Sequence, residues 1–211
     1  MKKIILSAVV AATLVPVVAQ ARPVSYPGGI TVMTQHNDET TSSHVHYSPT
    51  AKYSIGHRFE INREENFQLQ AAQVNYLVNR WNEPTSQANL YFKTGLGAAY
   101  NDNGPGSDLA AFVGVAADWE TRKYFVSYEN RYLEAGDIAS SFEQHARVGI
   151  APYVAEYGSI HTWLMLEAHY SEEAEDAFTL TPLVRFFKGP ALLELGVSTS
   201  GAALFNFIYR Y

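Results

Sequence analysis

The sequence predicts an all-β protein: an antiparallel transmembrane β-barrel of about twelve strands that follows a cleaved signal peptide. Three observations lead to this prediction. The first 21 residues have the layout of a secretory signal. The rest of the chain alternates apolar and polar residues with a period of two, and it contains no run of about 18 apolar residues that could form a membrane-spanning helix. We therefore divide the chain into a signal peptide, residues 1–21, and one outer-membrane β-barrel domain, residues 22–211.

The N-terminal segment has the three parts of a signal peptide in order. Lys2 and Lys3 supply positive charge, an apolar stretch follows, and Ala19-Gln20-Ala21 is a small-residue cleavage site. An uncleaved anchor helix is disfavoured because the apolar stretch is short and is interrupted by Pro16. The mature chain is therefore expected to leave the cytoplasm.

The composition excludes several classes of protein. The 211 residues include no cysteine, which rules out a disulfide scaffold, a thiolate metal site and a cysteine nucleophile. A net charge of −6 without a basic run argues against binding to nucleic acid. Aromatic residues make up 13% of the chain and charged residues only 17%, which suits a sheet whose outer surface is apolar.

Alternation defines ten strands in the second part of the chain. Their ranges are 51–61, 67–81, 90–100, 109–119, 124–132, 145–154, 160–170, 178–186, 191–198 and 203–211. Residues 30–36 and 42–48 add a first hairpin, which gives twelve; the alternative is ten strands after a periplasmic N-terminal segment. Both numbers are even, as in bacterial barrels. The apolar phase changes within 67–81, so a β-bulge is expected near Ala71.

Charged side chains recur in the middle of the polar face of many strands. Because both signs occur at similar depth, we expect them to be paired inside a closed and largely filled lumen. The predicted lumen-lining residues are Arg58, Lys93, Glu129, Arg131, Arg147, Glu167, His169 and Arg185. Most loops that alternation assigns to one side are acidic or rich in glycine and asparagine, whereas most turns on the other side are short.

Aromatic residues gather at the ends of the predicted strands, as in the girdles of membrane barrels. The chain also stops on an aromatic residue inside a strand, with Phe205, Phe207, Tyr209 and Tyr211 in one phase. This terminal strand resembles the assembly signal of bacterial outer-membrane β-barrel proteins. The resemblance implies residence in the outer membrane of a Gram-negative bacterium, contact with outer-membrane lipids, and recognition by the assembly machinery through residues 203–211. A soluble exported β-protein that binds a ligand is the alternative.

One histidine cluster has the spacing of a metal site. His44 and His46 flank a single residue, so both imidazoles would point to the same side of a strand, which suits Cu²⁺ or Zn²⁺. Met33 and His36 lie on the other arm of the predicted first hairpin, near the periplasmic mouth of the barrel. The alternative is that these histidines are ordinary polar residues of the barrel wall. No other cofactor is expected.

An enzyme alternative rests on a second pattern. His46, Ser48 and Glu60 resemble, in order and spacing, the base, nucleophile and orienting carboxylate of outer-membrane lipid A deacylases. Pro49 stands where that family has asparagine, the motif lies early in the barrel, and Glu60 is phased toward the lumen rather than the lipid. The favoured function is therefore non-enzymatic: a narrow channel or transport protein, or a structural surface protein, with metal handling as an addition.

Overall fold

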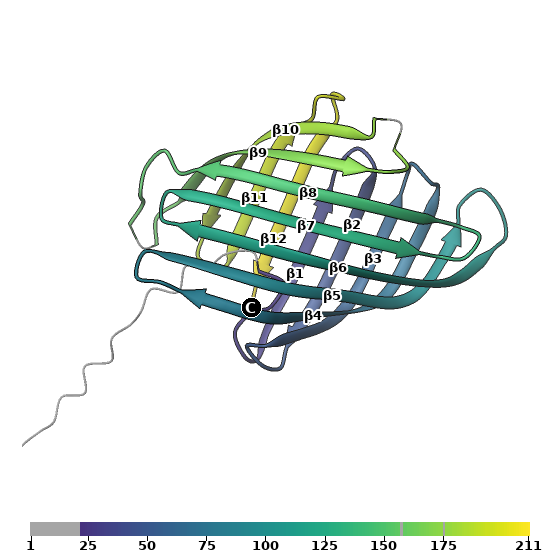
Figure 1. Cartoon of the computed structure of the whole chain (residues 1–211), viewed down its shortest axis with the longest axis horizontal. Coiled ribbons are helices and arrows are strands. Elements are labelled where there is room, and N and C mark those ends of the chain that lie inside the picture. The colour runs from purple at the N-terminus through teal and green to yellow at the C-terminus, as the bar shows by residue number, and fades with distance from the viewer. Residues whose placement is uncertain (1–21, 157, 175) are drawn as a thin grey trace, which may run out of the picture.

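The computed structural model describes residues 22–211 except residues 157 and 175, so the predicted signal peptide lies outside the described residues. Twelve strands form one closed antiparallel barrel, in which each strand pairs with its sequence neighbours and β1 pairs with β12 (Figure 1). The prediction of twelve strands is confirmed, and the alternative of ten is wrong because both arms of the first hairpin are strands. Within the described part of the chain, no helix is long and apolar enough to cross a membrane.

The strands differ in length, from seven residues in β11 to sixteen in β4 and β5. Their bounds are β1 Gly29–His36, β2 Thr40–Ser48, β3 Tyr53–Asn62, β4 Phe67–Asn82, β5 Ser86–Asn101, β6 Ser107–Thr121, β7 Tyr124–Glu134, β8 Ser140–Ile150, β9 His161–Ser171, β10 Phe178–Lys188, β11 Ala191–Val197 and β12 Ala203–Arg210. Because the strand number is even, β1 begins and β12 ends at the same end of the barrel. We call this the terminal end, and the opposite end, which carries the β1–β2 turn, the distal end.

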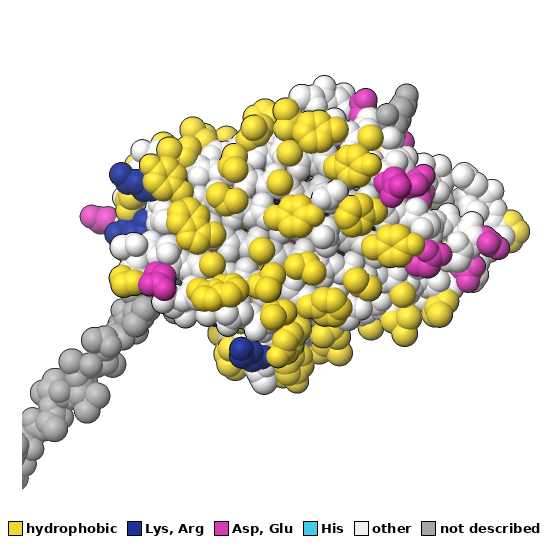
Figure 2. All heavy atoms as spheres, viewed as in Figure 1, with side chains coloured by type: hydrophobic (Ala, Val, Ile, Leu, Met, Phe, Trp, Pro, Cys, Tyr) yellow, Lys and Arg dark blue, Asp and Glu magenta, His cyan; other side chains and the backbone are white. Residues whose placement is uncertain are grey.

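The outer wall of the barrel is apolar. Alternate residues of the strands point outward and are largely exposed, among them Leu96, Leu109, Val113, Val148 and Val197. Figure 2 shows hydrophobic side chains spread over the visible wall, with acidic side chains gathered toward the distal end. Such a wall would be poorly hydrated in water and suits the hydrocarbon of a bilayer.

The inner wall carries apolar clusters as well as charges. One cluster lies on β4–β7 toward the distal end and is closed by the β7–β8 loop; it contains Phe67, Leu69, Phe112, Leu133 and Ala139. A second lies on β7–β12 and includes Phe125, Trp163, Leu183, Phe187 and Ile208. The lumen is therefore filled by side chains over part of its length, as the sequence predicted.

The bulge of β4 lies in a different place from the one predicted. The register shift occurs between Leu77 and Asn79 rather than near Ala71. Phe67, Leu69 and Ala71 keep the inward phase of their strand and belong to the distal apolar cluster. The apolar pattern changes sides near Ala71 because the inner wall is itself apolar there, and not because the strand is irregular.

Candidate functional site in the barrel lumen

The lumen contains an ion-pair group that joins β3 to the strands β7 and β8. Glu60 of β3 is fully buried and accepts a hydrogen bond from Arg58 Nε at 2.9 Å. Arg131 of β7 donates to both oxygens of the same carboxylate, with Nη1 to Oε2 at 2.8 Å and Nη2 to Oε1 at 2.7 Å. Arg131 also pairs with Glu143 of β8. Each buried charge in this group therefore has a partner of opposite sign.

A second ion-pair group lies on the strands β8 to β12. Glu194 of β11 accepts hydrogen bonds from Arg147 Nη1 at 3.1 Å and from Arg185 Nε at 2.6 Å. Asn206 of β12 donates to the same carboxylate at 2.6 Å. Arg147 also pairs with Glu167 of β9. One buried carboxylate and its donors thus tie together four strands, β8, β10, β11 and β12, and Arg147 adds β9 through Glu167.

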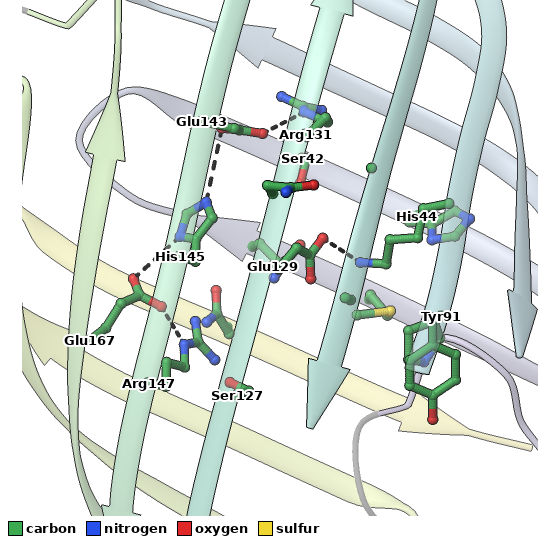
Figure 3. Close-up of a pocket in the computed structure, with 18 of the residues that line it drawn as sticks. Ser42, His44, Tyr91, Ser127, Glu129, Arg131, Glu143, His145, Arg147 and Glu167 are labelled. Carbon is green, nitrogen blue, oxygen red and sulfur yellow. Dashed lines mark hydrogen bonds and ion pairs between the residues drawn. The ribbon is translucent and has the colours of Figure 1, made fainter. Parts of the chain in front are cut away.

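Histidine side chains connect the two groups. His145 lies between Glu143, at 3.9 Å, and Glu167, at 3.8 Å. Figure 3 shows Arg131, Glu143, His145, Glu167 and Arg147 following one another along the inner wall. The ring of His145 also stacks on that of His169, with centroids 4.2 Å apart. His169 Nδ1 in turn lies 3.4 Å from a carboxylate oxygen of Glu39 in the β1–β2 turn.

The structure puts every predicted lumen-lining residue on the inner wall. Seven of them line one cavity: Arg58, Lys93, Glu129, Arg131, Arg147, Glu167 and Arg185. The remaining one, His169, lines a small pocket near the β11–β12 loop. Lys93 of β5 pairs with Glu129 of β7 across the intervening strand β6.

The cavity between these groups has a volume of about 200 Å³. Its lining extends from Asn37 and Thr40 at the distal end to Pro23 and Asp118 toward the terminal end. A cavity of this size, lined by charged groups, holds on the order of ten water molecules. The lumen is therefore polar and narrow in its middle part.

A short N-terminal segment, residues 22–25, enters the terminal end of the barrel. Ser54 Oγ donates to the Pro23 carbonyl at 2.7 Å, and the Ser25 amide donates to Ser48 Oγ at 3.0 Å. Val24 is 2% exposed and packs in a cluster with Leu77, Tyr91 and Ala116. The N-terminal segment thus occupies part of the inner space along β2–β6.

Charged contacts of Arg22 hold the start of this segment against the barrel wall. Arg22 forms an ion pair with Glu120 of β6, and Arg210 of β12 donates to the Arg22 carbonyl at 3.1 Å. Sequence reasoning did not predict this insertion, because residues 22–28 do not alternate and the turn at Pro27-Gly28 does not show where the chain before it lies. It also did not single out Glu143 or His145, which join the ion-pair groups.

The predicted metal residues separate into two sets. His44 and His46 both point inward and are 5% and 1% exposed, with ring centroids 4.6 Å apart. His36 lies on the opposite side of β1 from the inward-facing Met33, and its Nδ1 is 2.7 Å from Thr41 Oγ1. His36 therefore cannot share a site with the other two histidines unless the strand is rebuilt.

The three residues of the enzyme alternative do not come together. His46 and Ser48 are neighbours on the inner wall, but Glu60 is registered with Ser42 and is bound by two arginines. His46 lies four residues farther along β2, which is about 13 Å in a strand. The structure therefore holds no hydrogen-bonded chain of nucleophile, base and carboxylate at these positions.

No protein-family model and no curated protein matches the sequence. Solved structures match it by fold. The KdgM porin in complex with disordered oligogalacturonate is 8% identical, with a TM-score of 0.51 and coverage of 87% of this chain and 98% of that one. The KdgM porin alone has the same identity and coverage at a TM-score of 0.49. OccK8 (OprE) of Pseudomonas aeruginosa is 5% identical, with a TM-score of 0.43 and coverage of 82% of this chain and 57% of that one. The chain thus has the fold of outer-membrane β-barrel porins.

Proposed function

We propose that this protein is a narrow channel for small ions or solutes in the outer membrane of a Gram-negative bacterium, closed at its terminal end by its own N-terminal segment. The observation that carries this proposal is the contrast between the two walls. The outer wall is apolar, whereas the middle of the inner wall is charged and encloses a cavity of about 200 Å³. Charges at this depth are stable only when water or partners reach them.

Two features account for a closed resting state. The ion pair between Arg131 and Glu60 crosses the inner space, and the pair between Lys93 and Glu129 lies over β6 on the inner wall. At the terminal end, Val24 packs on Tyr91 in an apolar cluster. We infer that the first feature limits the width of the path and that the second blocks its exit.

Conductance in planar bilayers tests the proposal. The wild type is expected to give small current steps or none. Val24→Asp combined with Glu120→Gln removes the apolar contact and the Arg22 partner of the N-terminal segment, so this variant is expected to conduct several times more. Tyr26→Asp is the matched control, because Tyr26 belongs to the same stretch of chain but is 55% exposed. It is expected to behave as the wild type does.

The outcomes separate the two parts of the proposal. Large, stable steps in the wild type would show that the N-terminal segment does not close the path. No conductance in any of the folded variants would contradict the channel itself. That second result would favour a structural or surface role, which the mutual compensation of the lumen charges also suits.

A further inference from the structure

Two buried imidazoles meet on the inner wall of β2. His44 and His46 occupy successive inward positions, which lie on one side of a strand. Their ring centroids are 4.6 Å apart, and the ring planes are tilted by 37°. Because the planes are not parallel, nitrogen lone pairs of both rings can be directed toward one point between them and the lumen.

These rings lack the partners that buried polar groups normally have. Among the described residues, Nε2 of His44 and both ring nitrogens of His46 are buried without a hydrogen-bond partner. A neutral imidazole has one donor and one acceptor, and nearly all buried polar atoms in folded proteins are paired. In the described part of the chain, three ring nitrogens of one histidine pair are thus free of protein partners and available to a ligand.

Met33 supplies a third donor at the same place. It is registered directly opposite His44 across the β1–β2 pair, and both residues line the lumen cavity. Residues directly opposite on one side of an antiparallel pair have Cβ atoms about 5 Å apart. Met33 also packs against the apolar cluster on β7–β12, and rotation of its flexible side chain can bring the thioether sulfur to the space beside the His44 ring.

The charges around the pair select the kind of ion. Arg58 of β3 is registered directly opposite His44 across the β2–β3 pair, and its guanidinium is bound by Glu60. Neither of the two clusters of acidic and histidine side chains found in the described residues, Glu143–His145–His169 and Asp38–Glu39–His169, includes His44 or His46. A site with neutral donors and a guanidinium nearby disfavours a hard divalent ion. It favours a singly charged, soft one.

The cluster around His169 is a weaker candidate for a metal. The rings of His145 and His169 are stacked within 10° of parallel, so their in-plane lone pairs do not converge on one ion. His145 is also engaged by Glu143 and Glu167. This cluster is better described as part of the ion-pair system.

We propose that His44, His46 and Met33 form a binding site for Cu(I) on the inner wall of the barrel. Imidazole nitrogen and thioether sulfur are both ligands of copper, and the thioether favours the reduced ion. Two of the three ligands, Met33 and His44, line the polar cavity, which gives the ion a path to the site. Its occupancy does not require that the barrel conduct, so the two proposals are tested independently.

Competition titration of the folded full-length mature protein with Cu(I) tests the site. A chromophoric Cu(I) chelator serves as the competitor, in the presence of a reductant. The wild type is expected to bind one Cu(I), and His44→Gln with His46→Gln is expected to abolish binding. Met33→Leu is expected to weaken binding about tenfold, which corresponds to about 1.4 kcal/mol. His57→Gln is the matched control, because His57 is exposed on the outer side of the wall, in phase with Ile55; it is expected to leave binding unchanged.

X-ray absorption on the copper-loaded wild type keeps the test decisive if a variant fails to fold. Nitrogen ligands of imidazole type together with one sulfur ligand are expected. A spectrum without sulfur, the absence of Cu(I) binding, or equal binding by the folded double glutamine variant would overturn the proposal. Tighter binding of Zn²⁺ than of Cu(I) would overturn the assignment to a soft ion.

Discussion

Arg131 of β7 and Glu60 of β3 bind each other through two parallel hydrogen bonds, of 2.8 and 2.7 Å, although β4, β5 and β6 separate their strands in the sheet. A contact between such distant strands must cross the inside of the barrel. The pair therefore braces two walls at a fixed separation. Because Arg58 binds the same carboxylate, loss of Glu60 would leave two guanidinium groups without this partner.

The first prediction concerns this brace. Glu60→Gln removes one charge of a fully buried group and is expected to lower the free energy of unfolding by about 3–5 kcal/mol. Urea titration of the protein in detergent micelles measures this change. Glu83→Gln in the exposed β4–β5 turn is the control and is expected to change the free energy by less than about 0.5 kcal/mol. A loss below 1 kcal/mol for Glu60→Gln would show that the brace carries little stability.

The second prediction tests the membrane location by comparing lysine substitutions at two depths of the outer wall. Val113 lies in the middle of β6 and Leu109 near its distal end, and both point outward. In a bilayer, Val113→Lys is expected to cost about 2–4 kcal/mol and Leu109→Lys about 0–1 kcal/mol. Unfolding in lipid vesicles measures both values. A soluble barrel would show equally small costs at the two positions, and that result would contradict the membrane assignment.

The third prediction concerns the last residue. The backbone of Tyr211 exchanges two hydrogen bonds with Ile30, with N to O distances of 2.8 and 3.3 Å, where the barrel closes. Deletion of Tyr211 removes these bonds together with the terminal aromatic ring, whereas Tyr211→Asp removes only the ring. If the ring is the assembly signal, both variants are expected to lose the folded, heat-modifiable band on gels of outer-membrane fractions. A normal band for Tyr211→Asp would mean that closure of the backbone is sufficient.

The fourth prediction is a pH dependence in the β1–β2 turn. Burial raises the pKa of the Glu39 carboxyl from 4.5 to about 7, and the neighbouring Glu143 and Asp38 add to this increase. The folded protein then holds a proton that the unfolded chain releases. Stability is therefore expected to fall by about 2 kcal/mol as the pH rises from 4.5 to 7. Glu39→Gln is expected to flatten this part of the curve, and a carbon-13 titration of the Glu39 carboxyl gives the pKa directly.

The local part of the fold was accessible from the sequence, because the direction of a side chain in a strand depends only on its phase. That is why the inward positions of Arg58, Arg131 and Arg185 could be predicted. Their partners could not, because Arg131 and Glu60 meet only once the whole sheet has closed at a particular register. The same holds for Val24, whose burial depends on a cluster formed by β4, β5 and β6.

One predicted site fails on the phase rule, and the enzyme alternative fails on register. His36 is three residues from Met33, an odd spacing, so the two side chains must point to opposite sides of one strand. His46 and Glu60 do share the inner side, but antiparallel register decides their distance along it, and the sequence does not specify that register. Residues that are predicted to lie on the same wall therefore need not form a site.

The seam between β1 and β12 joins nearly the two extremes of the described chain. Among the strand pairs, this one has the greatest sequence separation, so the entropy of bringing its two strands together is highest there. Until it forms, both terminal strands present unpaired backbone groups to any other strand nearby. We therefore expect this seam to be the last part of the sheet to form, and the open-edged intermediate to be the state most prone to aggregation.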